Sequence, residues 1–359
     1  MTGLSAGKYW GLRRLAAPGG TFSMLAADQR PPIMAMIRSR TGRAPAFAEI
    51  AEVKRMLVGE LGLAASAVLI DPVWGLSAAL PDLPPRRGLL VTLEDHVYEE
   101  GPGGRRSAAI AEWSAEKIRR LGADAVKLLA WFRPDAAEEV VAHQRAFVAA
   151  AGDACRQHDI PFVLELLIYP FAAPGEADAN DAADPAKRPS LVLDSITPFA
   201  VEGVDLWKLE SPLPADAIPD PDGPGAAPVQ ALFDRLGGRV PGPWVMLSGG
   251  AEFAHFRAVL VYAYRAGASG FLAGRSIWAD AFQAWPDRAA CIQTLRETAR
   301  PRLERLSELT EKSAQAWHRH PRFGAGVSVA DAGAGFASAY GKDPCSARAA
   351  LTARPEAIA

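Results

Sequence analysis

The chain has 359 residues, of which 49% are hydrophobic and 22% charged, a composition typical of a globular protein with a large apolar core. Its 39 basic and 41 acidic side chains nearly balance, so it presents no broad basic field to a nucleic acid or an anionic lipid surface. No segment has the 18 or more apolar residues of a spanning helix, and the amino terminus lacks the apolar stretch of a signal peptide. We therefore expect neither nucleic acid nor a membrane as a partner.

The cysteines and histidines give no sign of a metal centre or a disulfide framework. Cys155, Cys291 and Cys345 are odd in number and widely spaced, which fits neither paired disulfides nor a paired metal motif. No cluster of histidines and carboxylates completes a ligand set. We expect a protein of the reducing cytoplasm that uses no metal and no other cofactor.

Short apolar runs bounded by turn residues alternate along the chain with segments of helical period. There are about eight such runs, the number that a closed (β/α)8 TIM barrel of the α/β class requires. The runs are nearly continuous in apolar residues, as expected for strands buried on both faces. They cover residues 22–28, 67–71, 88–94, 124–130, 162–168, 204–210, 243–249 and 269–275.

The segments between these runs predict the outer helices. Four of them carry apolar residues at three- and four-residue spacing, and each ends in a glycine suited to close a helix. They cover residues 49–62, 114–122, 136–152 and 253–267, with Gly62, Gly122, Gly152 and Gly267 at their ends.

Two segments depart from this rhythm. Residues 171–190 are rich in Ala, Asp and Pro and predict a long loop after the fifth strand, over the carboxyl ends of the strands. From residue 324 onward small residues dominate and periodicity is weak. We therefore predict a barrel domain over residues 1–323 and a carboxyl-terminal tail over residues 324–359.

Two lysines lie inside predicted strands, although the chain has only 8 lysines. Lys127 and Lys208 share the local pattern G-x-D-x-x-K-L, which begins at Gly122 and at Gly203. If their strands are the fourth and the sixth, both side chains point into the barrel interior and their ammonium groups lie close together.

This pair of lysines favours Schiff-base chemistry. Burial and a like-charged neighbour both lower the pKa of a lysine, and a partly neutral lysine is a nucleophile for a carbonyl carbon. Considered singly, either Lys127 or Lys208 could instead have a structural role. It could form an ion pair, or its side chain could reach the rim of the barrel.

Three carboxylates accompany the lysines. Glu165, in the fifth strand, lies between the two lysine strands, where burial is expected to raise its pKa and suit it to proton transfer. Asp28 ends the first strand and is followed by the polar residues Gln29 and Arg30. Glu210 lies two residues after Lys208 and so points to the same face of the strand, where it could balance the lysine's charge. Alternatively, Glu210 forms a salt bridge at the rim of the barrel.

The last two strands end in residues suited to bind phosphate. Loops after the seventh and eighth strands of barrel enzymes commonly bind phosphate through backbone N–H groups. Here Ser248, Gly249 and Gly250 end the seventh strand, and Arg275 ends the eighth with a forked cation that suits an oxyanion.

Together these stretches resemble the class I tagatose-1,6-bisphosphate aldolases and the related sulfofructose-phosphate aldolases. The similar segments run in family order from LAADQR (residues 25–30) through ADAVKLL, PFVLELL, DLWKLESP and WVMLSGG to GASGFLAGRSIW (residues 267–278). The resemblance implies that Lys208 forms the Schiff base, that Glu165 transfers protons and that Lys127 and Asp28 assist. It also implies phosphate binding by the Ser248–Gly250 segment and Arg275. We expect the polar side chains of Gln29 and Arg30, which follow Asp28, to bind the substrate.

The function expected from this resemblance is that of a lyase. It would cleave tagatose 1,6-bisphosphate to dihydroxyacetone phosphate and glyceraldehyde 3-phosphate. Alternatively, sulfofructose 1-phosphate would give dihydroxyacetone phosphate and sulfolactaldehyde. Two rivals are a barrel that binds sugar phosphates without catalysis and a barrel isomerase or epimerase, neither of which needs two buried lysines. A homo-oligomer is compatible with the sequence.

Overall fold

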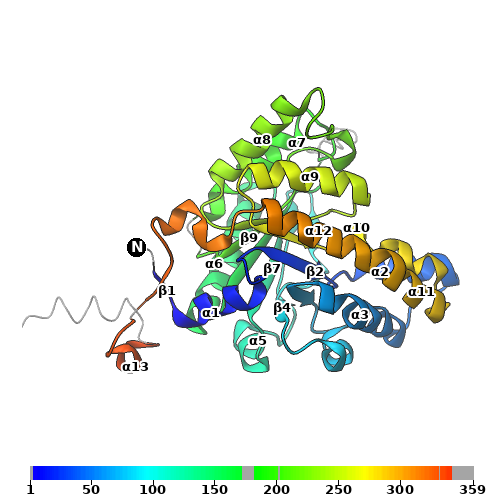
Figure 1. The fold of residues 1–359 in the computed structure, drawn as a ribbon, viewed down its shortest axis with the longest axis horizontal. Coiled ribbons are helices and arrows are strands. Elements are labelled where there is room, and N and C mark those ends of the chain that lie inside the picture. Colours follow the sequence, from blue (N-terminus) through cyan, green and yellow to red (C-terminus); the bar gives the residue numbers. More distant parts are fainter. Residues whose placement is uncertain (1–2, 172–181, 201–202, 331, 342–359) are drawn as a thin grey trace, which may run out of the picture.

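The computed structural model describes residues 3–171, 182–200, 203–330 and 332–341. Eight parallel strands form a closed barrel in the order β10-β11-β2-β3-β4-β7-β8-β9, which confirms the predicted (β/α)8 fold (Figure 1). Every predicted run overlaps one of these strands, and only β7 extends beyond its run, by one residue. They are β2 (Phe22–Ala26), β3 (Ala67–Ile70), β4 (Gly88–Thr92), β7 (Ala125–Trp131), β8 (Phe162–Leu167), β9 (Leu206–Leu209), β10 (Trp244–Met246) and β11 (Gly270–Ala273).

Alternate strand residues face the barrel interior and the surrounding helices. Phe22, Met24 and Ala26 of β2 pack in the inner apolar cluster, whereas Leu25 and Ala27 belong to the cluster between strands and helices. Because both faces of each strand are buried, the strands are apolar throughout, and a charged residue within one is conspicuous.

Helices surround the barrel and pack against the outer faces of its strands. The main outer helices are α2 (Pro31–Thr41), α3 (Phe47–Leu61), α5 (Ala115–Leu121), α6 (Glu138–Gln157), α8 (Ala226–Arg239), α9 (Phe253–Arg265) and α12 (Arg300–Ser313). Shorter helices are α4 (Leu76–Ala79), α7 (Arg188–Asp194), α10 (Arg275–Trp278), α11 (Arg288–Thr294) and α13 (Phe336–Ala339). None of the helices in the described ranges combines the length and the apolar character needed to cross a bilayer.

Three of the four predicted helices end within two residues of the predicted glycine. Gly122 adopts a left-handed conformation (φ +92°) after α5, and Gly267 does so (φ +89°) just beyond α9. Gly62 also follows the last residue of α3, but it keeps a right-handed conformation and begins a 3-10 turn. Gly152 lies buried within α6, which continues to Gln157. A glycine in a helical pattern therefore did not always mark its end, because close packing can also require a small residue.

The amino-terminal end of the barrel is covered by α1 (Ala6–Leu15), on the left in Figure 1. Nearby, β1 (Gly3–Leu4) pairs in parallel with β12 (Ser328–Val329), so the segment after residue 324 returns to this end. The rest of the predicted tail, residues 342–359, lies outside the described residues.

The loops at the carboxyl ends of the strands are the longer ones. After β4, strands β5 (Glu99–Gly101) and β6 (Gly104–Arg106) form an antiparallel hairpin. The Arg105 guanidinium lies between 4.6 and 4.9 Å from the ring centres of three aromatic side chains, which fixes the hairpin to the rim. Of the predicted loop over residues 171–190, residues 172–181 lie outside the described residues, and α7 begins at Arg188.

Candidate active site

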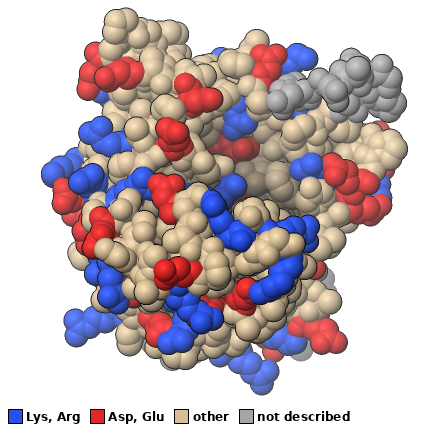
Figure 2. Space-filling model, turned by 90° about the vertical axis from the view of Figure 1, so that its right-hand side faces the viewer, with Lys and Arg blue, Asp and Glu red and all other residues tan. Residues whose placement is uncertain are grey.

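The face at the carboxyl ends of the barrel strands is hollowed near its centre, with acidic and basic side chains around the hollow (Figure 2). Six charged side chains converge below this surface, and each residue is at most 6% exposed. They come from five strands or the residues just after them, and are Asp28, Arg30, Glu94, Lys127, Glu165 and Lys208.

Lys127 is surrounded by carboxylates. Its Nζ lies 3.0 Å from Asp28 Oδ2, 2.8 Å from Glu94 Oε1 and 2.8 Å from Glu165 Oε2. Three anions around one ammonium group hold it firmly in the charged form. Lys127 is therefore well placed to orient carboxylates and is poorly suited to act as a neutral nucleophile.

Lys208 has a different environment. Its backbone pairs with that of Glu165 across β8 and β9, and its Nζ lies 2.9 Å from Glu165 Oε1. Within the described ranges this is its only ion pair. The two lysines thus approach the two oxygens of the same carboxylate, and Lys208 is the one less constrained by negative charge.

Glu94 is a member of this network that sequence reasoning missed. Its Oε1 contacts both Lys127 and the Arg30 guanidinium, at 2.8 and 3.2 Å, and its Oε2 accepts a hydrogen bond from the backbone N–H of Leu129. Arg30 also donates to the Glu94 carbonyl at 3.1 Å. The available signal was a glutamate at the end of the third predicted run, in the same position as the charged residues that end other strands.

The six charges balance, with three cations and three anions, and this balance corrects two expectations from the sequence. Burial lowers the pKa of Lys127, but Asp28, Glu165 and Glu94 outweigh it, so the pKa is raised. Burial raises the pKa of Glu165, but Lys127 and Lys208 outweigh it, so the pKa is lowered. The pKa of Asp28 is lowered by the same balance. Glu165 is therefore held in its carboxylate form.

A second buried ion pair supports Asp28 from outside the barrel. The Lys54 ammonium on α3 pairs with Asp71 after β3 and also donates to the carbonyl of Ala27 at 2.8 Å. Both side chains of the pair are fully buried. This contact holds the backbone next to Asp28 and so fixes where its carboxylate points.

The predicted phosphate residues meet at the ends of β10 and β11. The Arg275 guanidinium donates to the carbonyl of Gly249 at 2.9 Å, and burial lowers its pKa. Gly249 and Gly250 are both left-handed, with φ +60° and +91°. A Cβ on Gly250 would lie 3.0 Å from the Arg275 Cζ, so glycine allows this approach.

Gln29 lies next to these loops. A Cβ added to Gly274 would lie 2.8 Å from the Gln29 Nε2, so the side-chain amide is close to the end of β11. The buried Gln29 Oε1 has no hydrogen-bond partner in the described part of the chain. A buried amide oxygen without a partner is an acceptor available to a ligand.

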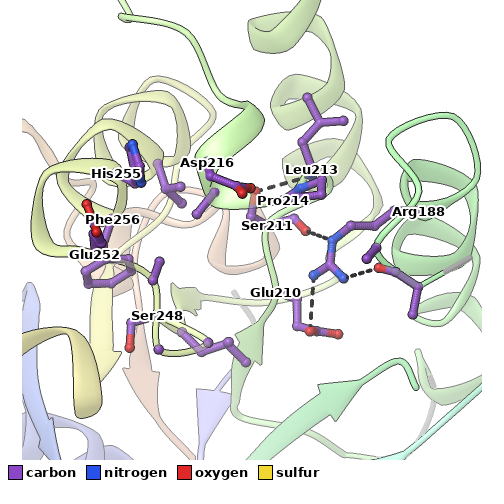
Figure 3. A pocket seen from close by; sticks show the side chains of 18 residues that line it. Arg188, Glu210, Ser211, Leu213, Pro214, Asp216, Ser248, Glu252, His255 and Phe256 are labelled. Carbon is purple, nitrogen blue, oxygen red and sulfur yellow. Dashed lines mark hydrogen bonds and ion pairs between the residues drawn. The ribbon is translucent and has the colours of Figure 1, made fainter. Parts of the chain in front are cut away.

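A cavity of about 520 Å³ opens beside the Ser248–Gly250 turn and extends toward α7 (Figure 3). On its far side Glu210 pairs with Arg188 at 3.1 Å, and Arg188 also donates to the carbonyls of Ser211 and Ala182. Of the two alternatives predicted for Glu210, the structure has the salt bridge at the rim, with Arg188 as the partner, and Glu210 does not balance Lys208. Lys187, next to Arg188, is exposed.

The arrangement combines an amine, a buried carboxylate base and a cationic turn at one mouth of the barrel. The described residues include no grouping of three His, Cys, Asp or Glu side chains that could hold a metal ion. The site offers the groups needed to form and break an imine.

Comparison with known proteins places the chain among aldolases of similar length. The model of the DeoC/LacD family aldolases matches residues 22–280. Tagatose 1,6-diphosphate aldolase 1 of Streptococcus mutans is 31% identical over 319 residues, covering 85% of this chain and 96% of that protein. Tagatose 1,6-diphosphate aldolase 2 of Enterococcus faecalis is 29% identical over 333 residues, covering 89% of this chain and 98% of that protein.

The fold is similar to that of solved aldolases. The fructose-bisphosphate aldolase of Plasmodium falciparum superimposes with a TM-score of 0.63 at 14% identity, covering 88% of this chain and 98% of that chain. An archaeal fructose 1,6-bisphosphate aldolase gives a TM-score of 0.54 at 18% identity, covering 84% of this chain and 98% of that chain.

Proposed function

Because the chain belongs to the DeoC/LacD family of aldolases, we propose that it is a class I aldolase whose Schiff base forms on Lys208. As an aldolase it is a lyase. The observation that carries the proposal is the unequal environment of the two buried lysines. Three carboxylates hold Lys127, and one carboxylate, Glu165, pairs with Lys208.

The proposed substrate is tagatose 1,6-bisphosphate. The curated relatives named above are tagatose 1,6-diphosphate aldolases, and the sequence similarity extends over 85% of this chain. Arg275 and the Ser248–Gly250 turn would bind the phosphate at carbon 1, next to the carbonyl that Lys208 attacks, and Gln29 would bind a hydroxyl of the substrate. The buried unpartnered Oε1 of Gln29 supports its part in binding, because a substrate hydroxyl would satisfy it.

In the first half of the reaction, Lys208 Nζ transfers a proton to Glu165 and adds to the keto carbon. The resulting carbinolamine loses water to give an iminium ion. A base then takes the proton of the hydroxyl on carbon 4, and the bond between carbons 3 and 4 breaks. The bonding electrons pass into the iminium, which becomes an enamine, and glyceraldehyde 3-phosphate leaves.

In the second half, carbon 3 of the enamine is protonated and water hydrolyses the iminium, releasing dihydroxyacetone phosphate. The water consumed here equals the water lost earlier. Glu165 is the base best placed for these transfers because its carboxylate contacts both lysines. Lys127 would keep Glu165 and Asp28 oriented and stabilise the alkoxide that develops on carbon 4.

Two described cysteines, Cys155 and Cys291, are free and buried, which supports a reducing compartment. We therefore propose a cytoplasmic location, which the free thiols and the sugar-phosphate chemistry both support.

Imine trapping tests the mechanism. Sodium borohydride with dihydroxyacetone phosphate should inactivate the enzyme irreversibly and add mass to the peptide that contains Lys208. Lys127→Met should still be trapped on Lys208, whereas Lys208→Met should not be trapped. Circular dichroism checks that both variants fold. An adduct on Lys127, or no adduct in the wild type, would overturn the assignment.

The substrate is tested separately by comparing kcat/KM for tagatose 1,6-bisphosphate and sulfofructose 1-phosphate. We expect the tagatose substrate to give the higher value. A higher value for the sulfonate would overturn the substrate and leave the role of Lys208 untouched.

A further inference from the structure

A second concave pocket lies at the amino-terminal end of the barrel, away from Lys208. Its floor contains Ser23, the second residue of β2, whereas Asp28 follows the other end of that strand. Its walls come from α1, from the turns before β2 and β4, and from α12 and the segment after it. The cavity measures about 740 Å³, within the range of about 300 to 1,000 Å³ that small-molecule sites occupy.

The pocket carries an excess of positive charge. Arg13, Arg86 and Arg87 line it, and Glu311 is the one acidic residue among its lining residues. In the described part of the chain, no carboxylate lies within ion-pair distance of these three guanidinium groups. His318 adds no charge at neutral pH, because burial and Arg319 lower its pKa. The net excess is two positive charges.

The floor contains a buried hydroxyl without a partner. Ser23 is 3% exposed, and its Oγ makes no hydrogen bond with any described residue. The neighbouring Ser66 Oγ accepts the backbone N–H of Ser23 at 3.0 Å and still has its own proton to donate. Buried hydroxyls are normally paired, so an unpaired one that lines a cavity indicates a missing partner.

The walls are held in place before any ligand arrives. The backbone N–H of Trp317 donates to the carbonyl of Gly20 at 2.9 Å, which joins the turn before β2 to the segment after α12. Gly20 is left-handed (φ +85°), and a Cβ there would lie 2.7 Å from the His318 ring. On α1, the Arg13 guanidinium lies 5.8 Å from the centre of the Tyr9 ring. A pocket formed in advance loses little conformational entropy on binding.

We propose that this pocket binds a phosphorylated small molecule at a site independent of the catalytic lysine. A phosphate dianion matches the excess of two positive charges, and its oxygens suit forked guanidinium groups. A third oxygen would accept a hydrogen bond from the hydroxyl of Ser23 or Ser66. A monocarboxylate would neutralise only half of the excess charge.

Binding of labelled inorganic phosphate, measured by equilibrium dialysis at low ionic strength, tests the proposal. The measurement uses Arg275→Ala as the background, because the catalytic face is also expected to bind phosphate. Adding Arg13→Gln and Arg86→Gln should raise the Kd at least tenfold, since each replaced guanidinium removes a charge-assisted hydrogen bond. Both residues are exposed enough to tolerate glutamine.

The matched control removes two arginines elsewhere on the surface. Arg120→Gln with Arg145→Gln takes the same charge from α5 and α6 and should change the Kd less than twofold. Ser23→Ala should also weaken binding, although it leaves every charge in place. With Arg275 intact, Arg13→Gln with Arg86→Gln should leave kcat/KM of the aldol reaction unchanged. An unchanged Kd, or an equal effect of the control pair, would overturn the site, and a fall in kcat/KM would overturn its independence.

Discussion

The role of Glu94 can be tested by removing its charge while keeping its shape. Glu94 is 1% exposed and contacts Lys127, Arg30 and the backbone N–H of Leu129. In Glu94→Gln, the amide oxygen still accepts one hydrogen bond, but the site changes from three cations and three anions to three cations and two anions. The excess charge is buried, where water cannot screen it.

The expected loss of stability is large. Removing one partner of a buried ion pair costs about 3 to 5 kcal/mol, and the acceptor that glutamine retains places this change near the lower value. Activity should fall as well, because Lys127 loses one of the three contacts that orient it. One charge-assisted hydrogen bond contributes about 1.5 to 3 kcal/mol. If that contact is needed in the transition state, kcat falls about tenfold to a hundredfold.

Urea unfolding measures the first effect, and a coupled assay of dihydroxyacetone phosphate release measures the second. The control is Glu304→Gln, which removes a carboxylate from the exposed face of α12. It should change the unfolding free energy by less than about 0.5 kcal/mol. If Glu94→Gln matches this control in both stability and kcat, the six charges do not act as one balanced network.

Three other outcomes are expected. Native Asp28 and Glu165 have lowered pKa values, so their stabilising contribution is complete above the unfolded pKa of about 4 and is lost as the pH falls below it. The urea midpoint should drop between pH 5 and pH 3, less steeply in Asp28→Asn, and an equal drop in both proteins would contradict this. Arg275→Ala should lower kcat/KM by roughly tenfold to a hundredfold and weaken inhibition by phosphate, whereas the exposed Arg257→Ala on α9 should do neither. Unchanged kinetics in Arg275→Ala would remove it from the site. Finally, EDTA should leave activity unchanged because the iminium ion serves as the electron sink, and activity restored by a divalent ion after EDTA treatment would refute this.

The sequence alone determined the barrel and most of the charged residues in its mouth. Each strand is buried on both faces, so its apolar run is visible without knowledge of its neighbours, and a charged residue within it is conspicuous. Lys127, Glu165 and Lys208 were found in this way. The resemblance identified the family, because the motifs of that family occur in the same order along the whole barrel.

Only the tertiary structure decided how these charges pair. The pKa of a buried group depends on which other charges lie within a few ångströms, and those neighbours come from strands far apart in the chain. Lys127 gains its third carboxylate from Glu94, 33 residues away, and its raised pKa reverses the shift expected from burial and a like-charged neighbour. Glu210 pairs with Arg188 because α7 brings that arginine over the end of β9. Residue spacing along a strand predicts which way a side chain points, whereas its partner is set by how the strands and loops close around the barrel.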